Sequence, residues 1–208
     1  MEQINIKQLF AQKYNNIKIL LKDGIKEVSL LENKENKQKI IMKEIDISKL
    51  NEKEKEMSEQ EEMILLKLKH PNIVKCYGFY YEKDKIIILI EYAEGGDLFN
   101  KIENQKNKNK YFKEEEIIDW FIEICEGIKY IHSKNIIHRD LKPQNIFLNK
   151  NNHIKIGDFG ISKQLINKNK TNTKLGSENY ISPEIINNQS YDYRIDIWNL
   201  GIILYELI

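Results

Sequence analysis

The residues best suited to chemistry gather in the stretch IIHRDLKPQNIFL, residues 136–148, and just beyond it. Asp140, Lys142 and Asn145 belong to this stretch, and Asp158 follows in GDFGISK. A carboxylate such as Asp140 can accept the proton of a hydroxyl group and orient it. Lysine can place positive charge beside a phosphoryl group, and the oxygens of asparagine and aspartate are hard ligands of the kind that Mg²⁺ prefers. These residue types suit positioning and charge neutralisation around a phosphoryl group.

Three motifs, in this order and at this spacing, resemble those of the eukaryotic protein kinases. They are HRDLKPQN at 138–145, Asp-Phe-Gly at 158–160 and Ser-Pro-Glu at 182–184. One tripeptide alone would be weak evidence, but three in register after a helical stretch at 113–134 are specific. The resemblance covers roughly residues 14 to 208.

The closest subfamily by resemblance is the NIMA-related kinases. The segments with that character are KEIDISKL at 43–50, EYAEGGDLF at 91–99, WFIEIC at 120–125 and GDFGISK at 157–163. A lysine two places after the catalytic aspartate is also typical of serine/threonine kinases. The resemblance therefore implies transfer of the γ-phosphoryl group of Mg-ATP to serine or threonine hydroxyls of protein substrates.

In this family Asp140 would be the catalytic base and Lys142 would contact the transferring phosphoryl group. Asn145 and Asp158 would be the two Mg²⁺ ligands. A loop aspartate that caps a turn, or a solvated surface lysine, is the plain structural alternative for Asp140 and Lys142 respectively.

The family pattern also assigns residues before the hinge to the nucleotide. Lys43, in IIMKEI, would contact the α- and β-phosphates, with Glu61 on the following helix as its carboxylate partner. An exposed strand lysine is the alternative for Lys43. Leu20 and Val28, which flank the first hairpin loop, complete this part of the nucleotide-binding set.

The stretch IIILIEYAEGGDLF resembles the junction between the two kinase lobes. Ile90 would close the back of the adenine pocket, and the backbone of Glu91 and Ala93 would hydrogen-bond the adenine edge. Asp97 matches the position that faces the ribose. Asp97 is equally placed to cap the helix that begins at LFNKI, and both roles can hold together.

The first hairpin loop departs from the family pattern of three glycines. The three positions hold Leu21, Asp23 and Lys26, with Gly24 between them. Glycine lets backbone N–H groups approach phosphates without interference from a Cβ atom. Asp23 would in addition repel the phosphates, and Lys26 would offset part of that repulsion. We therefore predict weakened ATP binding, which keeps a rival open: a pseudokinase or kinase-like scaffold with little turnover.

Two further expectations concern the second half of the chain. Thr173, with Thr171 as a neighbouring candidate, lies where phosphorylation by an activating kinase or by the protein itself would supply a partner for Arg139. Kinase domains of this type continue past the helix expected at 194–208, so the C-terminal lobe is expected to be incomplete. A fragment that does not fold alone is a third, weaker possibility.

The elements that must position these residues define an α+β class with two lobes. Apolar runs separated by polar turns predict strands at 17–21, 28–31, 40–42, 76–81 and 86–90, and two short ones at 145–148 and 153–156. Helical spacing predicts helices at about 52–68, with Met57, Ile64, Leu65 and Leu68 on its apolar face, and at 113–134, with Ile117, Phe121, Cys125, Ile128 and Ile131. The run at 194–208 is apolar nearly all round, which is typical of a buried helix.

These elements predict a leader at 1–13 and a kinase domain at 14–208. Within that domain we expect a small antiparallel β-sheet lobe with one helix at about 14–90, a hinge at about 91–96 and a mainly helical, partial lobe at about 97–208.

The composition of the chain limits the partners and the location that can be expected for it. The chain has 33 Lys+Arg and 32 Asp+Glu, a net charge of +1, so it shows no bulk attraction to nucleic acid or to an acidic membrane. The longest apolar runs are too short to span a bilayer, and no secretory signal is evident. Two cysteines without metal-ligand spacing predict a reduced, cytoplasmic protein. Cytoskeletal or nuclear association stays open.

Overall fold

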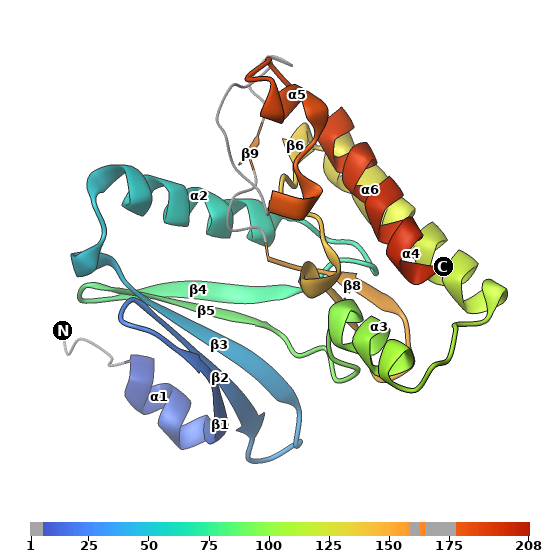
Figure 1. Cartoon of the computed structure of the whole chain (residues 1–208). Helices are drawn as coiled ribbons and strands as arrows, with labels where there is room; N and C mark the ends of the chain where they lie inside the picture. The colour runs from blue at the N-terminus through green and yellow to red at the C-terminus, as the bar shows by residue number, and fades with distance from the viewer. Residues whose placement is uncertain (1–5, 159–162, 165–177) are drawn as a thin grey trace. The chain divides into compact units, whose positions relative to one another are not determined.

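The computed structural model describes residues 6–158, 163–164 and 178–208. The chain folds into two compact units (Figure 1). Unit 1 consists of Met1–Leu66 and Lys75–Tyr92, and unit 2 consists of Lys67–Val74 and Ala93–Ile208.

Unit 1 is built on one five-stranded antiparallel sheet with strand order β1-β2-β3-β5-β4. The strands are β1 (Tyr14–Lys22), β2 (Lys26–Asn33), β3 (Lys39–Asp46), β4 (Cys76–Glu82) and β5 (Lys85–Glu91). All five contain the runs predicted from the sequence, which are rich in the β-branched and aromatic residues that strands favour. Sequence-adjacent strands pair as hairpins, except that β3 pairs with β5.

The two faces of this sheet have separate cores. Ile45, Ile86 and Ile88 pack together on one face. Leu31, Ile40, Ile87 and Leu89 form the cluster on the other face, where Phe10 packs against them. Each of these buried isoleucines and leucines contributes roughly 1.5–3 kcal/mol through removal of apolar surface from water.

Helix α1 (Ile6–Lys13) lies within the segment expected to be only a leader. Phe10 joins it to the sheet core, with its ring 5.9 Å from that of Tyr14 and 5.8 Å from that of Tyr80. The Lys34 ammonium donates to the carbonyl of Ala11 at 2.7 Å. A short helix with few apolar residues carries little periodicity, which explains why the sequence did not reveal it.

Helix α2 (Glu52–Lys67) follows the short 3₁₀ turn η1 (Ile47–Lys49). A reciprocal capping box starts it: the Glu54 N–H donates to Asn51 Oδ1 at 3.0 Å, and the Asn51 N–H donates to Glu54 Oε2 at 2.9 Å. Ile64 and Leu65 of the predicted apolar face are buried. The prediction of this helix is confirmed.

Unit 2 is mainly helical. Its helices and 3₁₀ turns are α3 (Leu98–Asn107), α4 (Glu114–Ser133), η2 (Pro143–Asn145), η4 (Glu178–Tyr180), α5 (Pro183–Ile186) and α6 (Arg194–Leu207). Its strands are short and antiparallel: β7 (Ile146–Leu148) pairs with β8 (Ile154–Ile156), and β6 (Ile136–Ile137) pairs with β9 (Lys163–Gln164). Helices α4 and α6 pack side by side (Figure 1). The predicted helices at 113–134 and 194–208 and both short strands are confirmed.

The buried face of α4 is shifted from the predicted one. Trp120, Ile124, Ile128 and Ile131 are buried, whereas Ile117, Phe121 and Cys125 lie half-buried on its flank. The shift follows Trp120, because its indole N–H donates to the Asn152 carbonyl at 2.9 Å, in the turn between β7 and β8. In the described ranges, neither α4 nor any other helix has the length and apolar character needed to cross a membrane.

Helix α6 is covered on one side only. Ile195, Leu200 and Ile203 are buried, but Trp198 is 46% exposed and Tyr205 82% exposed. The run at 194–208 therefore forms the predicted helix, and its predicted burial is confirmed for one side of that helix. The covered side carries two polar residues, which matter for the site below.

Candidate active site

The loop between β6 and η2, called the catalytic loop below because it carries the predicted catalytic residues Asp140 and Lys142, has its backbone fixed by a buried carboxylate on α6. Asp196 Oδ2 accepts the His138 N–H at 2.9 Å, and Asp196 Oδ1 accepts the Arg139 N–H at 3.0 Å. Arg139 adopts φ +71°, a left-handed conformation that is rare outside glycine. The two hydrogen bonds hold this conformation immediately before Asp140.

A third donor reaches the same carboxylate. His132 Nε2, on the last turn of α4, lies 2.8 Å from Asp196 Oδ2. The Asp196 side chain is fully buried, and a buried carboxylate is tolerated only when donors satisfy it. Neither Asp196 nor His132 was predicted from the sequence as a site residue. The available signal was an aspartate between two isoleucines of a largely apolar helix, since such a residue is almost never buried without partners.

Three predicted catalytic residues meet on this loop. Lys142 Nζ lies 2.8 Å from Asp140 Oδ2, and the two side chains are 19% and 16% exposed. Asn145 Nδ2 donates to the Asp140 carbonyl at 2.8 Å and to Asp140 Oδ2 at 3.0 Å. Asp140 thus has its carboxylate oriented by an ammonium and an amide and still reaches the surface. The plain alternative of a solvated lysine is not what the structure shows for Lys142.

The same asparagine connects to the segment that carries Asp158. The Gly157 N–H donates to the Asn145 carbonyl at 2.9 Å. A Cβ atom on Gly157 would lie 2.8 Å from the Phe147 ring, so only glycine allows this approach. Asp158 follows directly, is exposed and has φ +55°.

These two residues fit a magnesium ion by their chemistry. Because Asn145 directs its NH₂ group at Asp140, its Oδ1 points the opposite way, and among the described residues no donor engages that oxygen. Asp158 adds an exposed carboxylate. Among the described residues, no group of three or more histidine, cysteine or acidic side chains is placed to hold a metal ion. Mg²⁺ needs none, since it is usually held by one or two protein oxygens together with phosphates and water.

A second buried polar residue of α6 ties the catalytic loop to a later segment. Asn199 Nδ2 donates to the Leu141 carbonyl at 3.0 Å and to the Tyr180 carbonyl at 3.1 Å. The Tyr180 hydroxyl in turn donates to Glu206 Oε1 at 2.7 Å, and burial, together with this bond, raises the pKa of Tyr180. Asn199 was also missed from the sequence, because nothing local distinguishes a bridging amide from a surface one.

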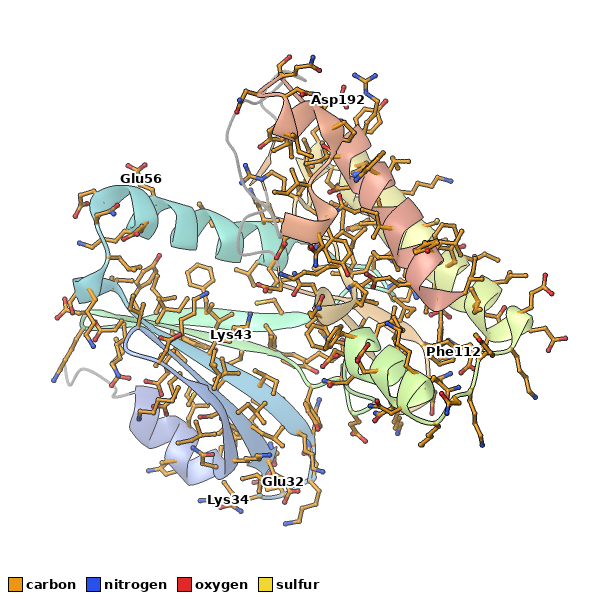
Figure 2. The ribbon with its side chains drawn as sticks, in the orientation of Figure 1. Glu32, Lys34, Lys43, Glu56, Phe112 and Asp192 are labelled. Carbon is orange, nitrogen blue, oxygen red and sulfur yellow. The ribbon has the colours of Figure 1, made fainter. Side chains whose placement is uncertain are left out.

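In unit 1, Lys43 lies in the middle of β3 (Figure 2). In the sheet register it is opposite Val28 of β2 and Ile88 of β5. Directly opposed residues of an antiparallel sheet share a face, so the lysine stands among apolar neighbours. Ile90 packs on the same face. Lys43 is half-buried, so the predicted strand context is confirmed and a fully exposed lysine is not observed. Leu20, on the edge strand β1, is 46% exposed.

Some predictions fall outside the described residues. Glu61 lies within α2, but its side chain is not among those described, so its pairing with Lys43 stays a prediction. Phe159, Gly160, Thr171 and Thr173 also lie outside the described ranges.

The predicted hinge residues divide between the units. In unit 1, the Glu91 N–H donates to the Lys75 carbonyl at 2.8 Å. In unit 2, the Ala93 carbonyl accepts the Gly96 N–H at 3.3 Å, and in the described part of the chain the Ala93 N–H has no protein acceptor. Asp97 is the N-cap of α3 and accepts the Asn100 N–H at 2.7 Å. Capping is therefore confirmed for Asp97, whereas its contact with a ribose is untested.

The β1–β2 loop forms a closed turn. Asp23 Oδ1 accepts the Ile25 N–H at 2.7 Å and the Lys26 N–H at 2.6 Å. The bonds from Lys26 and Ile25 lower the pKa of the Asp23 carboxyl below its ordinary value. Gly24, at the tip, does not adopt a positive φ and has open space around it. The missing glycines thus coincide with a loop that binds its own carboxylate.

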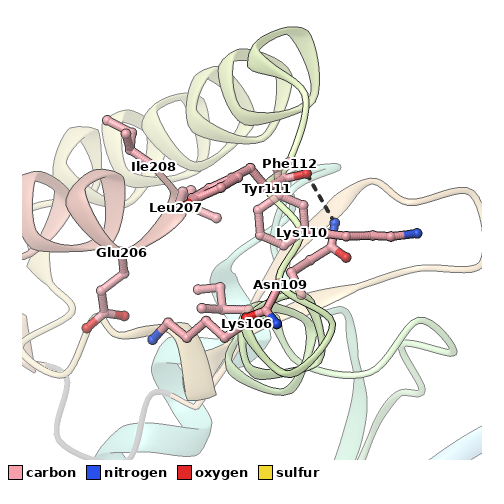
Figure 3. A pocket seen from close by; sticks show the side chains of 10 residues that line it. Lys106, Asn109, Lys110, Tyr111, Phe112, Glu206, Leu207 and Ile208 are labelled. Atoms are coloured by element: carbon pink, nitrogen blue, oxygen red, sulfur yellow. Dashed lines mark hydrogen bonds between the residues drawn. The ribbon is translucent and has the colours of Figure 1, made fainter.

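A pocket of about 290 Å³ in unit 2 lies away from these residues (Figure 3). It is lined by the end of α3, the segment Asn109–Phe112 and the end of α6. None of the predicted site residues lines it.

Comparison with known proteins agrees with the geometry. Residues 15–208 match the protein kinase domain, and the chain belongs to this family. Within it, the chain is similar to NIMA-related kinases, as the motifs predicted.

The similar proteins carry serine/threonine-kinase names. The chain is 41% identical over 197 residues to human "Serine/threonine-protein kinase Nek5". The aligned segment covers 94% of this chain and 28% of the relative. It is 40% identical over 200 residues to mouse "Serine/threonine-protein kinase Nek1", with 94% and 16% coverage. A Dictyostelium discoideum relative, "Probable serine/threonine-protein kinase nek3", is 40% identical over 200 residues, with 94% and 18% coverage. The chain thus spans less than a third of the length of each of these relatives.

Proposed function

We propose that this domain is a serine/threonine protein kinase that transfers the γ-phosphoryl group of Mg-ATP to protein hydroxyls. The observation that carries the proposal is the Asp140–Lys142–Asn145 arrangement on a loop whose backbone is fixed by Asp196. Phosphoryl transfer depends on positioned charge, and this arrangement supplies it. The complete catalytic set argues against a pure scaffold, for which no described residue gives positive support.

Asp140 would accept the proton of the attacking serine or threonine hydroxyl and hold that oxygen in line. Its bonds from Lys142 and Asn145 fix the carboxylate before substrate arrives. Lys142 would exchange its contact with Asp140 for the transferring phosphoryl oxygens, since both are anionic. Asn145 Oδ1 and Asp158 would hold Mg²⁺, which neutralises charge on the phosphates.

The nucleotide would use the residues that the family pattern assigns to it. Lys43, oriented by Glu61, would neutralise the α- and β-phosphates. The adenine would contact the apolar residues Leu20, Val28 and Ile90 and the backbone of Glu91 and Ala93. Asp97 would accept a hydrogen bond from the ribose in addition to the two bonds that its carboxylate accepts from Asn100 of α3.

The direct test is phosphate transfer from labelled ATP to a generic basic protein, with and without Mg²⁺. Asp140→Asn should lower turnover by about 10²-fold or more, the usual scale of a general base, while nucleotide affinity stays unchanged. Asp84→Asn is the matched control, because Asp84 is an exposed hairpin aspartate of the β4–β5 turn. Equal turnover of Asp140→Asn and the parent would remove Asp140 from the mechanism. Tight nucleotide binding with no transfer by any form would select the scaffold.

The partners follow from the same proposal. They are proteins that present serine or threonine, and an activating kinase, or the domain itself, that phosphorylates Thr173. Arg139, beside the catalytic aspartate, would pair with that phosphate. The even charge balance gives no support for a nucleic-acid or membrane partner. We further propose a cytoplasmic location, in keeping with the two cysteines being reduced thiols.

A further inference from the structure

The tip of the β1–β2 hairpin uses its backbone amides internally. Asp23 Oδ1 accepts the N–H groups of Ile25 and Lys26, at 2.7 and 2.6 Å. The Asp23 N–H itself donates to the Lys26 carbonyl at 2.9 Å. Three of the four consecutive amides from Asp23 to Lys26 are therefore engaged within the loop.

Two contacts from the turn before α2 hold the tip in this form. The Lys49 ammonium donates to the Gly24 carbonyl at 2.6 Å, and it also lies 3.3 Å from Asp46 Oδ2. The Asp46 N–H donates to the Ile25 carbonyl at 2.9 Å. Opening the turn would break these bonds as well as those to Asp23. The closed form is therefore held by bonds within the turn and by bonds from the segment that precedes α2.

Backbone amides at such a turn are good anion ligands, because successive N–H groups converge on one point. A carboxylate and a phosphate are both anionic acceptors and compete for the same donors. In this chain the carboxylate is part of the loop and is always present, whereas a phosphate arrives from solution.

We propose that Asp23 acts as an internal anion that occupies the Ile25 and Lys26 amides and so excludes nucleotide phosphates from them. The inference rests on the proposed function, since it assumes that a nucleotide binds beside this loop. It makes Asp23 a determinant of selectivity: the nucleoside part binds normally, and the phosphates contribute less affinity than they would to an open loop. The lowered pKa of Asp23 keeps the carboxylate charged over the working range of pH.

Occupancy of the amides differs from simple charge repulsion, and two variants separate them. Asp23→Asn removes the charge but keeps an oxygen that can accept the two N–H groups. Asp23→Ala removes both the charge and the acceptor, so it alone frees the amides. Asp84→Ala is the matched control, because it changes net charge equally at an exposed position of another hairpin of the same sheet.

The measured quantity is the ratio of ATP affinity to adenosine affinity, obtained by calorimetry on the full chain. Asp23→Ala should raise this ratio by about threefold to tenfold, the scale of added hydrogen bonds to a charged group at an exposed site. Asp23→Asn should raise it by a smaller factor, and Asp84→Ala should leave it unchanged. In amide NMR spectra, ATP should shift the Ile25 and Lys26 resonances strongly in Asp23→Ala and weakly in the parent.

Equal gains in Asp23→Asn and Asp23→Ala would overturn the proposal in favour of repulsion alone. An unchanged ratio in Asp23→Ala, with adenosine still bound, would overturn it while leaving nucleotide binding intact. Failure of every form to bind either adenosine or ATP would instead overturn the proposed function itself, and this inference with it.

Discussion

Replacing Asp196 should loosen the catalytic loop without touching any residue that meets substrate. The carboxylate accepts three donors, the backbone N–H groups of His138 and Arg139 and the ring of His132, at 2.8 to 3.0 Å. In Asp196→Asn one of the two oxygens becomes an NH₂ group, which would face a backbone N–H at hydrogen-bond distance. At least one buried donor is then left without an acceptor.

The size of the effect follows from that count. A buried polar group left unpaired costs about 1–3 kcal/mol, and the exchange also removes charge from two remaining bonds, so we expect a loss of about 2–4 kcal/mol in the free energy of unfolding. Asp196→Ala removes all three bonds and should cost about 3–5 kcal/mol, the scale of a broken buried ion pair. Because domains are stable by roughly 5–15 kcal/mol, the asparagine variant should still fold.

Urea unfolding followed by circular dichroism measures the loss in the free energy of unfolding. Turnover at saturating ATP measures the effect of the looser loop on phosphate transfer. Turnover should fall because Arg139 is no longer held at positive φ beside Asp140. His132→Ala is the partial control: it removes one bond and keeps both backbone bonds, so it should cost less than Asp196→Asn. An asparagine variant that unfolds at the parental urea concentration and turns over normally would refute the anchoring role.

Three further predictions concern other parts of the chain. Thr173→Ala should abolish activation, and mass spectrometry should find phosphate on Thr173 of the active parent; undiminished activity and an unphosphorylated loop would show that no such switch exists. The triple variant Leu21→Gly, Asp23→Gly, Lys26→Gly should raise the ratio of ATP to adenosine affinity, with a net gain limited by the roughly 0.5–1 kcal/mol of flexibility that each glycine adds; calorimetry decides, and a constant ratio means the native loop already suffices. Asn199→Ala should raise the KM for a peptide substrate more than the KM for ATP, because the amide joins the catalytic loop to a later segment. Asn199→Asp should behave in the same way, because a carboxylate cannot donate the two hydrogen bonds to the carbonyls. Equal changes in the two KM values would argue for a merely structural role of Asn199.

The sequence predicted the strands of unit 1 because each is a short apolar run between polar turns. It also predicted that Asp140, Lys142 and Asn145 would lie together, since they are close in the chain, and the structure brings their side chains into contact. Lys43 was placed on a strand for the same local reason. Such features need no long-range information.

The residues that fix the catalytic loop could not be found that way. Asp196 and Asn199 lie 58 positions from the groups His138 and Leu141 that they hold. Their partners are backbone atoms, which have no sequence signature. A carboxylate and an amide in an apolar helix are only a hint that buried donors and acceptors exist somewhere else.

Asp23 illustrates the opposite error, in which the right residue was given an incomplete role. From the sequence it was a negative charge near phosphates. The structure shows its oxygen taken by Ile25 and Lys26, so its effect includes the donors it withholds as well as the field it creates. Side-chain bonds to a neighbouring backbone are typical of aspartate in turns.

Charged groups and neutral loop amides contribute unequally to the binding and reaction of the nucleotide, and this difference determines how the β1–β2 loop should affect the domain. Lys43, Lys142 and a metal ion on Asn145 and Asp158 would carry formal charge, which acts strongly on phosphates throughout the reaction. Loop amides are neutral donors at an exposed site, where each bond contributes less. A loop that withholds its amides should therefore weaken binding of ATP in the ground state more than it slows the chemical step. The absence of the three glycines is thus an argument about the affinity for ATP, and it gives no ground for classing the domain as a pseudokinase.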